Sequence, residues 1–261
     1  MNQLKMSALV LALTGIAASS AMAQSKVNAW EGAYGQVGVG FGVFTPKIGS
    51  GTDVTGVPAS SQAYGYPATV SQNASASSVN NVNTGLANLA AGYNFGINET
   101  WILGLGATYY PGASSSATGT LSVASTTMTS PYGAAVGSPA TVPGGSSVAT
   151  YNVKNLYSIV LTPGYAIDKA RLAYAKVGYT GATIGLSGPT LAYQSTNLTG
   201  YTLGIGYKQM FTESFYGFGE VNYASYGSQS LTATLTTGTK LQGMTVSGVG
   251  TDILVGVGYR F

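Results

Sequence analysis

The ten residues Asp252-Ile253-Leu254-Val255-Gly256-Val257-Gly258-Tyr259-Arg260-Phe261 carry the pattern that decides the fold. Counted back from Phe261, every second residue is apolar, and the residues between them are small or charged except for Leu254. Alternate side chains of a strand point to opposite faces, so one face is apolar and ends in aromatic rings. About ten residues is also the length of a tilted strand that crosses a bilayer. The pattern predicts a transmembrane β-strand.

The other end of the chain has the composition of an export signal. Lys5 precedes an apolar run from about Ala8 to Ala18, and Ala21-Met22-Ala23 matches an A-x-A cleavage site. We therefore expect a Sec-type signal peptide over residues 1–23 and a mature barrel over residues 24–261. The alternative is an N-terminal transmembrane helix, but the apolar run is shorter than the ~20 residues that a helical span needs.

The overall composition is unusual for a protein whose surface faces only water. Charged residues make up 7% of the chain, against roughly 25% in soluble domains, and there are 38 glycines and 19 tyrosines. No second long apolar run occurs, so the hydrophobicity must be distributed by alternation. The absence of cysteine excludes a small disulfide scaffold. The net charge of +3 does not indicate a nucleic-acid partner.

Alternating segments and turn residues divide the mature chain into eight expected strands. They are about Gly32–Phe44, Gly85–Phe95, Trp101–Tyr110, Lys154–Ala166, Arg171–Thr180, Gly200–Gln209, Phe215–Tyr226 and a last strand that ends at Phe261. Three connections are short polar turns: Asn98-Glu99-Thr100, Asp168-Lys169-Ala170 and Thr212-Glu213-Ser214. The other four are long, at about residues 45–84, 111–153, 181–199 and 227–250.

Short and long connections that alternate between an even number of strands are typical of bacterial outer-membrane barrels. We therefore predict an all-β fold: an eight-stranded antiparallel up-and-down barrel with short periplasmic turns and long extracellular loops. A soluble β-sandwich also alternates, but its outward face would be polar rather than edged with Tyr, Trp and Phe. Pro163 lies inside the fourth strand and cannot donate to a ladder, so irregular pairing is expected there.

Trp30-Glu31-Gly32-Ala33-Tyr34, the eight alternating strands and the terminal Tyr259-Arg260-Phe261 together resemble the porin-like, opacity-type outer-membrane β-barrel domain. The transmembrane domain of outer-membrane protein A is similar, although that family usually adds a periplasmic domain. The resemblance implies a bacterial outer-membrane location and contact with outer-membrane lipid and lipopolysaccharide. It also implies that Phe261 and Tyr259 form the signal read by the barrel assembly machinery.

Inward-facing charges make the lumen one candidate site. Strand parity places Glu220, Lys176, Lys208 and Arg260 inside, with Lys154 and Asp252 near the outer rim. Charges in so narrow a lumen are costly unless they are paired or hydrated. Glu220 therefore either pairs with one of these cations as a structural plug or closes a water-filled path as a gate. The register between the strands is not contained in the sequence.

The long connections are the other candidate site. The first two are rich in Ser, Thr, Ala, Gly, Asn and Pro, which predicts disordered or loosely structured loops. Alternation at residues 120–123 and 231–235 suggests that some strands extend as hairpins, one of which turns near Thr237-Gly238. Their tyrosines are possible anchors for an extracellular ligand: Tyr64, Tyr66, Tyr132 and Tyr193. A passive loop set is the alternative.

No enzyme is expected. The chain has no histidine, which removes the usual base for a serine nucleophile and a common metal ligand, and its seven carboxylates are scattered. We expect no catalytic, metal or cofactor site. The sequence favours a structural or surface-interaction role through the extracellular loops. A narrow, low-conductance porin-like channel for ions or small solutes is the alternative.

Overall fold

The computed structural model describes residues 26–111, 113, 115–129, 140–234 and 240–261. The predicted signal peptide with Ala21 and Ala23 lies outside the described residues, as do Tyr132 and the turn near Thr237-Gly238. The described part forms β1 (Gly32–Ile48), β2 (Gly51–Gly56), α2 (Ala59–Gln62), β3 (Thr69–Ser77), β4 (Val82–Gly96), β5 (Trp101–Tyr109), β6 (Ser115–Val123), β7 (Thr126–Met128), β8 (Ala140–Val142), β9 (Gly145–Ala166), β10 (Arg171–Gly188), β11 (Leu191–Met210), β12 (Phe215–Thr234) and β13 (Lys240–Arg260).

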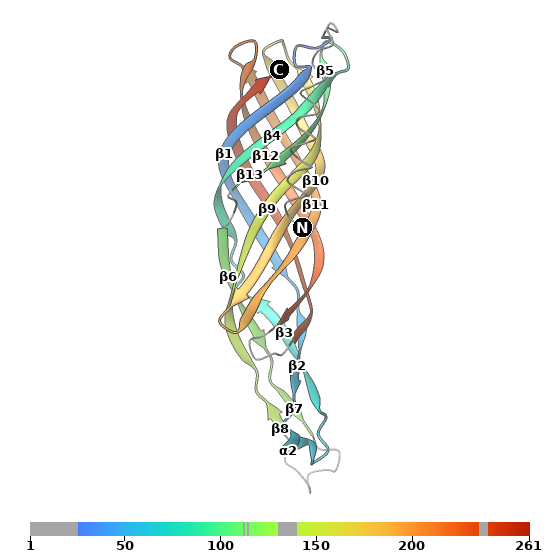
Figure 1. Ribbon diagram of the computed structural model, residues 1–261, viewed down its shortest axis with the longest axis vertical. Coiled ribbons are helices and arrows are strands. Elements are labelled where there is room, and N and C mark those ends of the chain that lie inside the picture. Colours follow the sequence, from blue (N-terminus) through green and yellow to red (C-terminus); the bar gives the residue numbers. More distant parts are fainter. Residues whose placement is uncertain (1–25, 112, 114, 130–139, 235–239) are drawn as a thin grey trace.

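Eight strands close into an antiparallel ring in the order β1-β4-β5-β9-β10-β11-β12-β13, and β13 returns to pair with β1 (Figure 1). The closing ladder runs from Tyr34 opposite Arg260 to Ile48 opposite Val246. These strands match the eight that the sequence predicts, except that Tyr110 and Phe261 lie one residue beyond the ends of β5 and β13. The all-β, up-and-down barrel is confirmed, and the sandwich alternative is excluded because a sandwich does not close on itself. We call this the membrane ring.

The three short turns share one construction. Asn98, Asp168 and Thr212 occupy the same position, and each side-chain oxygen accepts backbone N–H bonds from the residues two and three further along. Short polar side chains stabilise tight turns by such local bonds. The predicted turn residues therefore set where the strands end on this side, which is the top of Figure 1.

The outer wall of the membrane ring is apolar. On β1, for example, the side chains of Val37, Val39 and Phe41 are exposed on the outer face, whereas Gln36 on the inner face is buried. Aromatic side chains ring both edges of this wall: Trp101, Tyr165, Phe215 and Tyr259 near the short turns, and Tyr109, Tyr157, Tyr179, Tyr201 and Tyr223 at the other edge. An apolar band between two aromatic girdles is the lipid-facing surface of a transmembrane barrel. No helix in the described ranges has the length and apolarity of a helical span.

The first two long connections are largely β-strands where the structure describes them, so the prediction that they are loosely structured is wrong there. β9 to β13 continue past the membrane ring, and β2, β3 and β6 pair with them to form a second layer of eight strands (Figure 1, lower half). Its hydrogen-bonded order is β12-β13-β2-β3-β6-β9-β10-β11, and within the described residues the ladder between β11 and β12 ends at Gly200 opposite Tyr226. We call this layer the extracellular ring, because long connections of such barrels lie outside the cell. The predicted hairpin from β12 and β13 is part of it.

The extracellular ring has an apolar interior that composition alone hides. Its inward side chains form one buried cluster: Phe44, Ala74, Val82, Leu121, Ala149, Tyr151, Val153, Ala182, Ile184, Leu186, Leu191, Leu198, Tyr226, Leu231, Leu241, Met244 and Val246. Each contributing strand carries one to three of these residues among many Ser, Thr and Gly. The cluster forms only when segments far apart in sequence come together, so the pattern of no single segment predicts it.

Strand irregularities mark the border between the two rings. On β9, Asn155 has a φ of 53° and lies in a bulge where Asn155 and Leu156 oppose Ala182 alone. The bulge inverts the parity of the residues before it, so Val153 is buried and Lys154 faces outward. The predicted inward position of Lys154 is therefore wrong. At Pro163 the ladder with β10 is interrupted, as expected, but without a bulge.

Candidate functional site

The lumen of the membrane ring contains a polar cluster that spans three neighbouring strands. Lys176 lies on β10, Lys208 on β11 and Glu220 on β12, and all three side chains are at most 6% exposed. The strand register places Gly204 and Gly206 of β11 between the cluster residues of β10 and β12. A side chain at position 206 would overlap the Tyr174 ring, so the glycine lets β10 side chains reach β12.

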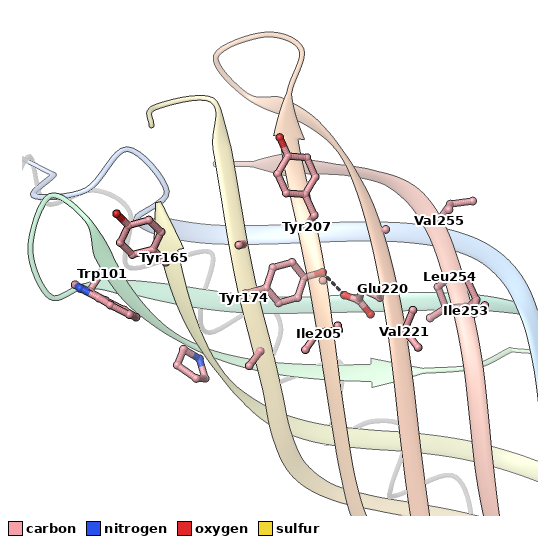
Figure 2. A pocket seen from close by; sticks show the side chains of 15 residues that line it. Trp101, Tyr165, Tyr174, Ile205, Tyr207, Glu220, Val221, Ile253, Leu254 and Val255 are labelled. Carbon is pink, nitrogen blue, oxygen red and sulfur yellow. Dashed lines mark hydrogen bonds between the residues drawn. The ribbon is translucent and has the colours of Figure 1, made fainter. Parts of the chain in front are cut away.

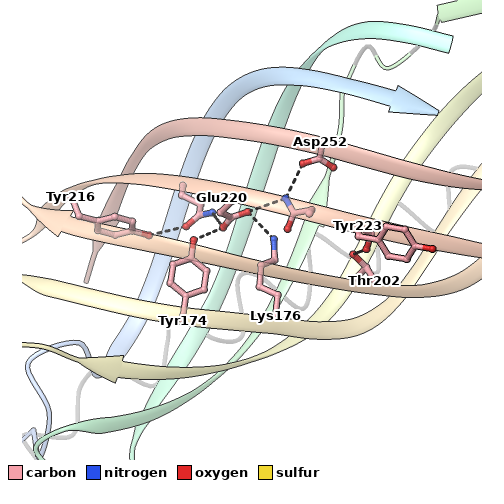
Figure 3. A network of polar contacts seen from close by, with 9 residues as sticks. Tyr174, Lys176, Thr202, Tyr216, Glu220, Tyr223 and Asp252 are labelled. Carbon is pink, nitrogen blue, oxygen red and sulfur yellow. Dashed lines mark hydrogen bonds and ion pairs between the residues drawn. The ribbon is translucent and has the colours of Figure 1, made fainter. Parts of the chain in front are cut away.

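Glu220 is the centre of the cluster (Figure 3). Lys176 Nζ lies 2.8 Å from Glu220 Oε2 as an ion pair, and Tyr174 OH donates to Oε1 at 2.6 Å. Gln36 Nε2 and Asn222 Nδ2 donate longer bonds, at 3.4 and 3.5 Å. Four donors from three strands thus surround one buried carboxylate, which is how a charge is retained in a narrow interior.

Lys208 is held differently. Its ammonium group lies over three tyrosine rings, 4.3 Å from the centroid of Tyr34, 4.9 Å from that of Tyr216 and 5.1 Å from that of Tyr174. Within the described ranges it forms no ion pair within 4 Å. Cation–π contacts of desolvated lysines contribute roughly 2 kcal/mol each. The tyrosine rings therefore compensate part of the desolvation of this cation.

The fourth predicted lumen charge, Arg260, lies apart from the other three. Its guanidinium donates to the Glu213 carbonyl oxygen at 2.7 Å, at the rim beside the last short turn. Asp252 extends the cluster on the opposite side, where it accepts a 2.8 Å bond from Asn222. The polar chain therefore runs along the lumen from Asp252 through Asn222 to Glu220, Gln36 and Tyr216 (Figure 3).

Bulky side chains fill the lumen on both sides of this chain. From the periplasmic mouth, Trp30 inserts against Tyr216 with ring centroids 5.8 Å apart, and Asn28 anchors the segment by donating to the Asn98 and Glu99 carbonyl oxygens. Trp30 is 1% exposed. On the other side, the buried side chains of the apolar cluster occupy the interior of the extracellular ring. Between the two lies a cavity of about 50 Å³ with Leu86 and Asp252 among its lining.

A larger depression, of about 750 Å³, lies mainly on the outer wall near the short turns. Figure 2 shows Trp101, Tyr165 and Tyr207 beside the strand ends that border it, with Tyr174 and Glu220 on the lumen side of the same wall. Its lining is almost entirely apolar, and bilayer lipid covers this face of a barrel. The depression is therefore part of the lipid-facing surface.

The terminal aromatics predicted as an assembly signal lie together on the outer wall. Tyr259 contacts Phe215 and Phe261, each with ring centroids 4.9 Å apart, and all three side chains are exposed. The backbone N–H of Phe261 donates to the Ala33 carbonyl oxygen, which fixes the chain end to the first strand. Recognition by the assembly machinery stays a prediction.

In the turns outside the membrane, Asp168 and Arg171 form an exposed pair, with Arg171 Nε 2.7 Å from Asp168 Oδ2. This hydrogen bond, with backbone N–H donors from the same turn, lowers the pKa of the Asp168 carboxyl. Burial of Tyr151 in the extracellular ring raises the pKa of its hydroxyl to about 12. The Tyr151 hydroxyl has no hydrogen-bond partner among the described residues.

Sequence reasoning found the charges of this site but not their partners. Strand parity also puts Gln36 and Asn222 on the inward face, whereas the roles of Tyr34, Tyr174 and Tyr216 depend on the register and were missed. The even spacing of Tyr174 and Lys176 on β10, and of Tyr216 and Glu220 on β12, is the signal that could have indicated them. No group of three or more potential metal ligands occurs within the described ranges.

No family model matches this sequence, and no curated protein matches it either. Solved structures that match include OprG of Pseudomonas aeruginosa (13% identity, 88% of this chain and 97% of that chain, TM-score 0.49). They also include the attachment invasion locus protein of Yersinia pestis (15%, 88% and 99%, 0.37) and the protease OmpT of Escherichia coli (10%, 88% and 96%, 0.45). All three are outer-membrane proteins, but likenesses at these identities and scores assign no function to this chain.

Proposed function

We propose that this protein is a closed outer-membrane barrel that acts at the cell surface, as a structural and surface-interacting protein, through its extracellular ring. It would reside in the bacterial outer membrane after export and assembly. Its direct surroundings would be outer-membrane lipid and lipopolysaccharide, with an extracellular ligand at the ring or its tip.

The observation that supports this proposal is the filling of the lumen at two levels. The Glu220 cluster with Trp30 fills the membrane ring, and the apolar cluster fills the extracellular ring. The second ring also carries a small cluster of Val57, Tyr66 and Met128 near its tip. Such a construction holds surface side chains in fixed positions, which favours binding over transport.

Two measurements test this role. The refolded protein in a planar bilayer should show no conductance steps, with insertion verified by the heat-sensitive mobility shift of folded barrels. On cells, replacing residues 57–68 at the tip by a short turn should reduce attachment to epithelial monolayers while the barrel still assembles. Unchanged attachment and growth after this replacement would argue against a surface role for the tip.

A narrow pore is the second candidate, and one observation favours it. The amide of Asn88 and Oδ1 of Asn222 are buried in the lumen without a partner among the described residues, which indicates water in this region. Glu220→Ala should then open a water path and raise conductance. A silent wild-type barrel that stays silent with Glu220→Ala would exclude the gate and leave the surface role.

A further inference from the structure

We propose that the outer face of β9, β10 and β11, just beyond the tyrosine girdle, binds the phosphorylated sugar headgroup of an outer-leaflet glycolipid. The patch consists of Asn152, Lys154 and Asn155 on β9, Thr183 on β10, and Tyr193 and Asn197 on β11. The inference goes beyond the proposed function, since it requires only a barrel in the outer membrane.

The bulge at Asn155 creates the patch. By parity Lys154 would point into the lumen, but two residues of β9 oppose Ala182 alone, and both Lys154 and Asn155 face outward. A left-handed φ of 53° is unusual for a residue other than glycine, and asparagine tolerates it best. Bulges of this kind often re-aim a side chain at a functional site. Here the re-aimed side chain is a cation.

The side chains next to Lys154 form a continuous polar surface with it. Thr183 pairs with Lys154 on one side and with Asn197 on the other. Asn155 Nδ2 donates to Thr183 Oγ1 at 3.4 Å, and Thr183 Oγ1 donates to Asn197 Oδ1 at 2.9 Å. The three side chains therefore hold one another in place across three strands and present a polar surface that suits a polyhydroxylated ligand.

An aromatic ring borders the patch. Tyr193 is 56% exposed and lies over Gly185, beside the Asn152 amide, whose Oδ1 has no partner within the described part of the chain. A side chain at Gly185 would collide with both. An exposed ring next to amide groups combines an apolar platform with hydrogen-bonding groups, which suits the apolar face and the hydroxyl rim of a sugar.

The charge and the height of the patch select the ligand. The sequence has no Asp or Glu on β9, β10 or β11, so nothing on these strands repels an anion near Lys154. Lys154 lies three residues beyond Tyr157 of the girdle, which is roughly 10 Å along the strand and less in height because the strand is tilted. Lipid headgroups occupy about that depth beyond the hydrocarbon core. A phosphate there would meet the Lys154 ammonium.

Lipid A with two phosphates is the probe, and native mass spectrometry of the refolded full-length mature protein in detergent measures its binding. Lys154→Gln should weaken binding about tenfold, the range of one charge-assisted contact, and should not change binding of dephosphorylated lipid A. Tyr193→Leu should weaken binding of both forms. The heat-sensitive mobility shift verifies that each variant is folded.

Two matched controls keep the proposal falsifiable. Lys47→Gln removes an exposed lysine of β1, and Tyr64→Leu removes an exposed tyrosine of the tip; both should leave binding within about twofold of wild type. An equal loss with Lys47→Gln would mean diffuse charge attraction and overturn the site. Equally tight binding of phosphatidylglycerol would show that an anionic lipid without sugar suffices, and would overturn the glycolipid assignment.

Discussion

The membrane ring and the extracellular ring share five strands, β9 to β13, yet their polarity is inverted. In the membrane ring Lys176 and Glu220 point inward and Val177 and Val221 outward. In the extracellular ring the inward residues include Ile184 and Leu198, whereas Thr183 and Asn197 point outward. Lipid surrounds the membrane ring, so its apolar side chains face outward, whereas water surrounds the extracellular ring, so its apolar side chains face inward. The same strands therefore change the polarity of their two faces where they leave the membrane.

The largest effect is expected from Glu220→Ala in the membrane ring. It would leave Lys176 buried without its partner, a change that destabilises by about 3–5 kcal/mol. Urea unfolding in lipid vesicles, followed by tryptophan fluorescence, measures it. The double variant Lys176→Met, Glu220→Leu should recover most of the loss, since it removes both charges. A double variant as unstable as the single one would contradict a paired interior.

Leu198→Ala tests the extracellular ring with the opposite kind of interior. Leu198 is fully buried in the apolar cluster, so its truncation should cost about 2–5 kcal/mol. The loss should be local: hydrogen exchange should quicken near Ile184 and Thr196 but not near Ile205, which lies in the membrane ring. Uniformly faster exchange would show that the two rings unfold as one unit. Ser195→Ala, at an exposed position of the same strand, is the control and should leave the exchange rates unchanged.

Replacing an outward-facing residue by lysine in each ring distinguishes a lipid-facing surface from a water-facing one. Val255→Lys on the lipid-facing wall should destabilise by about 2–4 kcal/mol, whereas Ser195→Lys on the outside of the extracellular ring should change stability by less than about 0.5 kcal/mol. Both are read from urea midpoints in vesicles. Equal midpoints would mean that the outer faces of the two rings meet the same solvent.

At the border between the rings, Asn155→Val should cost about 1–2 kcal/mol because a β-branched residue disfavours the left-handed backbone. Asn155→Gly should be close to neutral, because glycine adopts this conformation freely. Urea midpoints compare the two. If valine were tolerated as well as glycine, the bulge would not be needed at this residue.

The smallest effect is a pH dependence at the short turns. Because Arg171 lowers the pKa of Asp168, the pair stabilises the fold above the carboxyl's unfolded pKa of about 3.9, and the gain disappears as the pH falls through the lower folded value. The carboxyl chemical shift of Asp168 should report this titration. Asp168→Asn should keep the turn, as Asn98 does in the first one, and abolish the dependence.

The membrane ring could be predicted from the sequence, whereas most of the extracellular ring could not. Trp101, Arg171 and Phe215 begin strands as predicted, because local turn bonds and girdle aromatics mark these ends. The extracellular ring depends on pairing between β3 and β6, or β2 and β13, over long sequence separations. No local pattern encodes such pairing. The bulge at Asn155 also reverses the face, inward or outward, that alternation predicts for every β9 residue before it.

The candidate site in the lumen could likewise be predicted only in part. Parity placed Lys176, Lys208 and Glu220 inside the lumen, since alternation is a local property of each strand. Their separation into an ion pair and a tyrosine-bound lysine depends on register across three strands and on Gly206. Arg260 shares the inward parity but lies at the rim, because parity gives the face of a residue and not which neighbours it can reach.

The strand β13 pairs with β1 in the membrane ring and with β2 in the extracellular ring, so a single strand joins the start of the chain to its end in both. These contacts join the first strands of the chain to the last one and have the largest sequence separation in the fold. Contacts of this kind are the slowest to form, because the entropy of closing a long loop must be lost before they stabilise anything. We expect an open sheet with two unpaired edges to persist until β13 docks, and the rate of folding to be set there. A helper protein that shortens the lifetime of this open state would need to hold only that one strand.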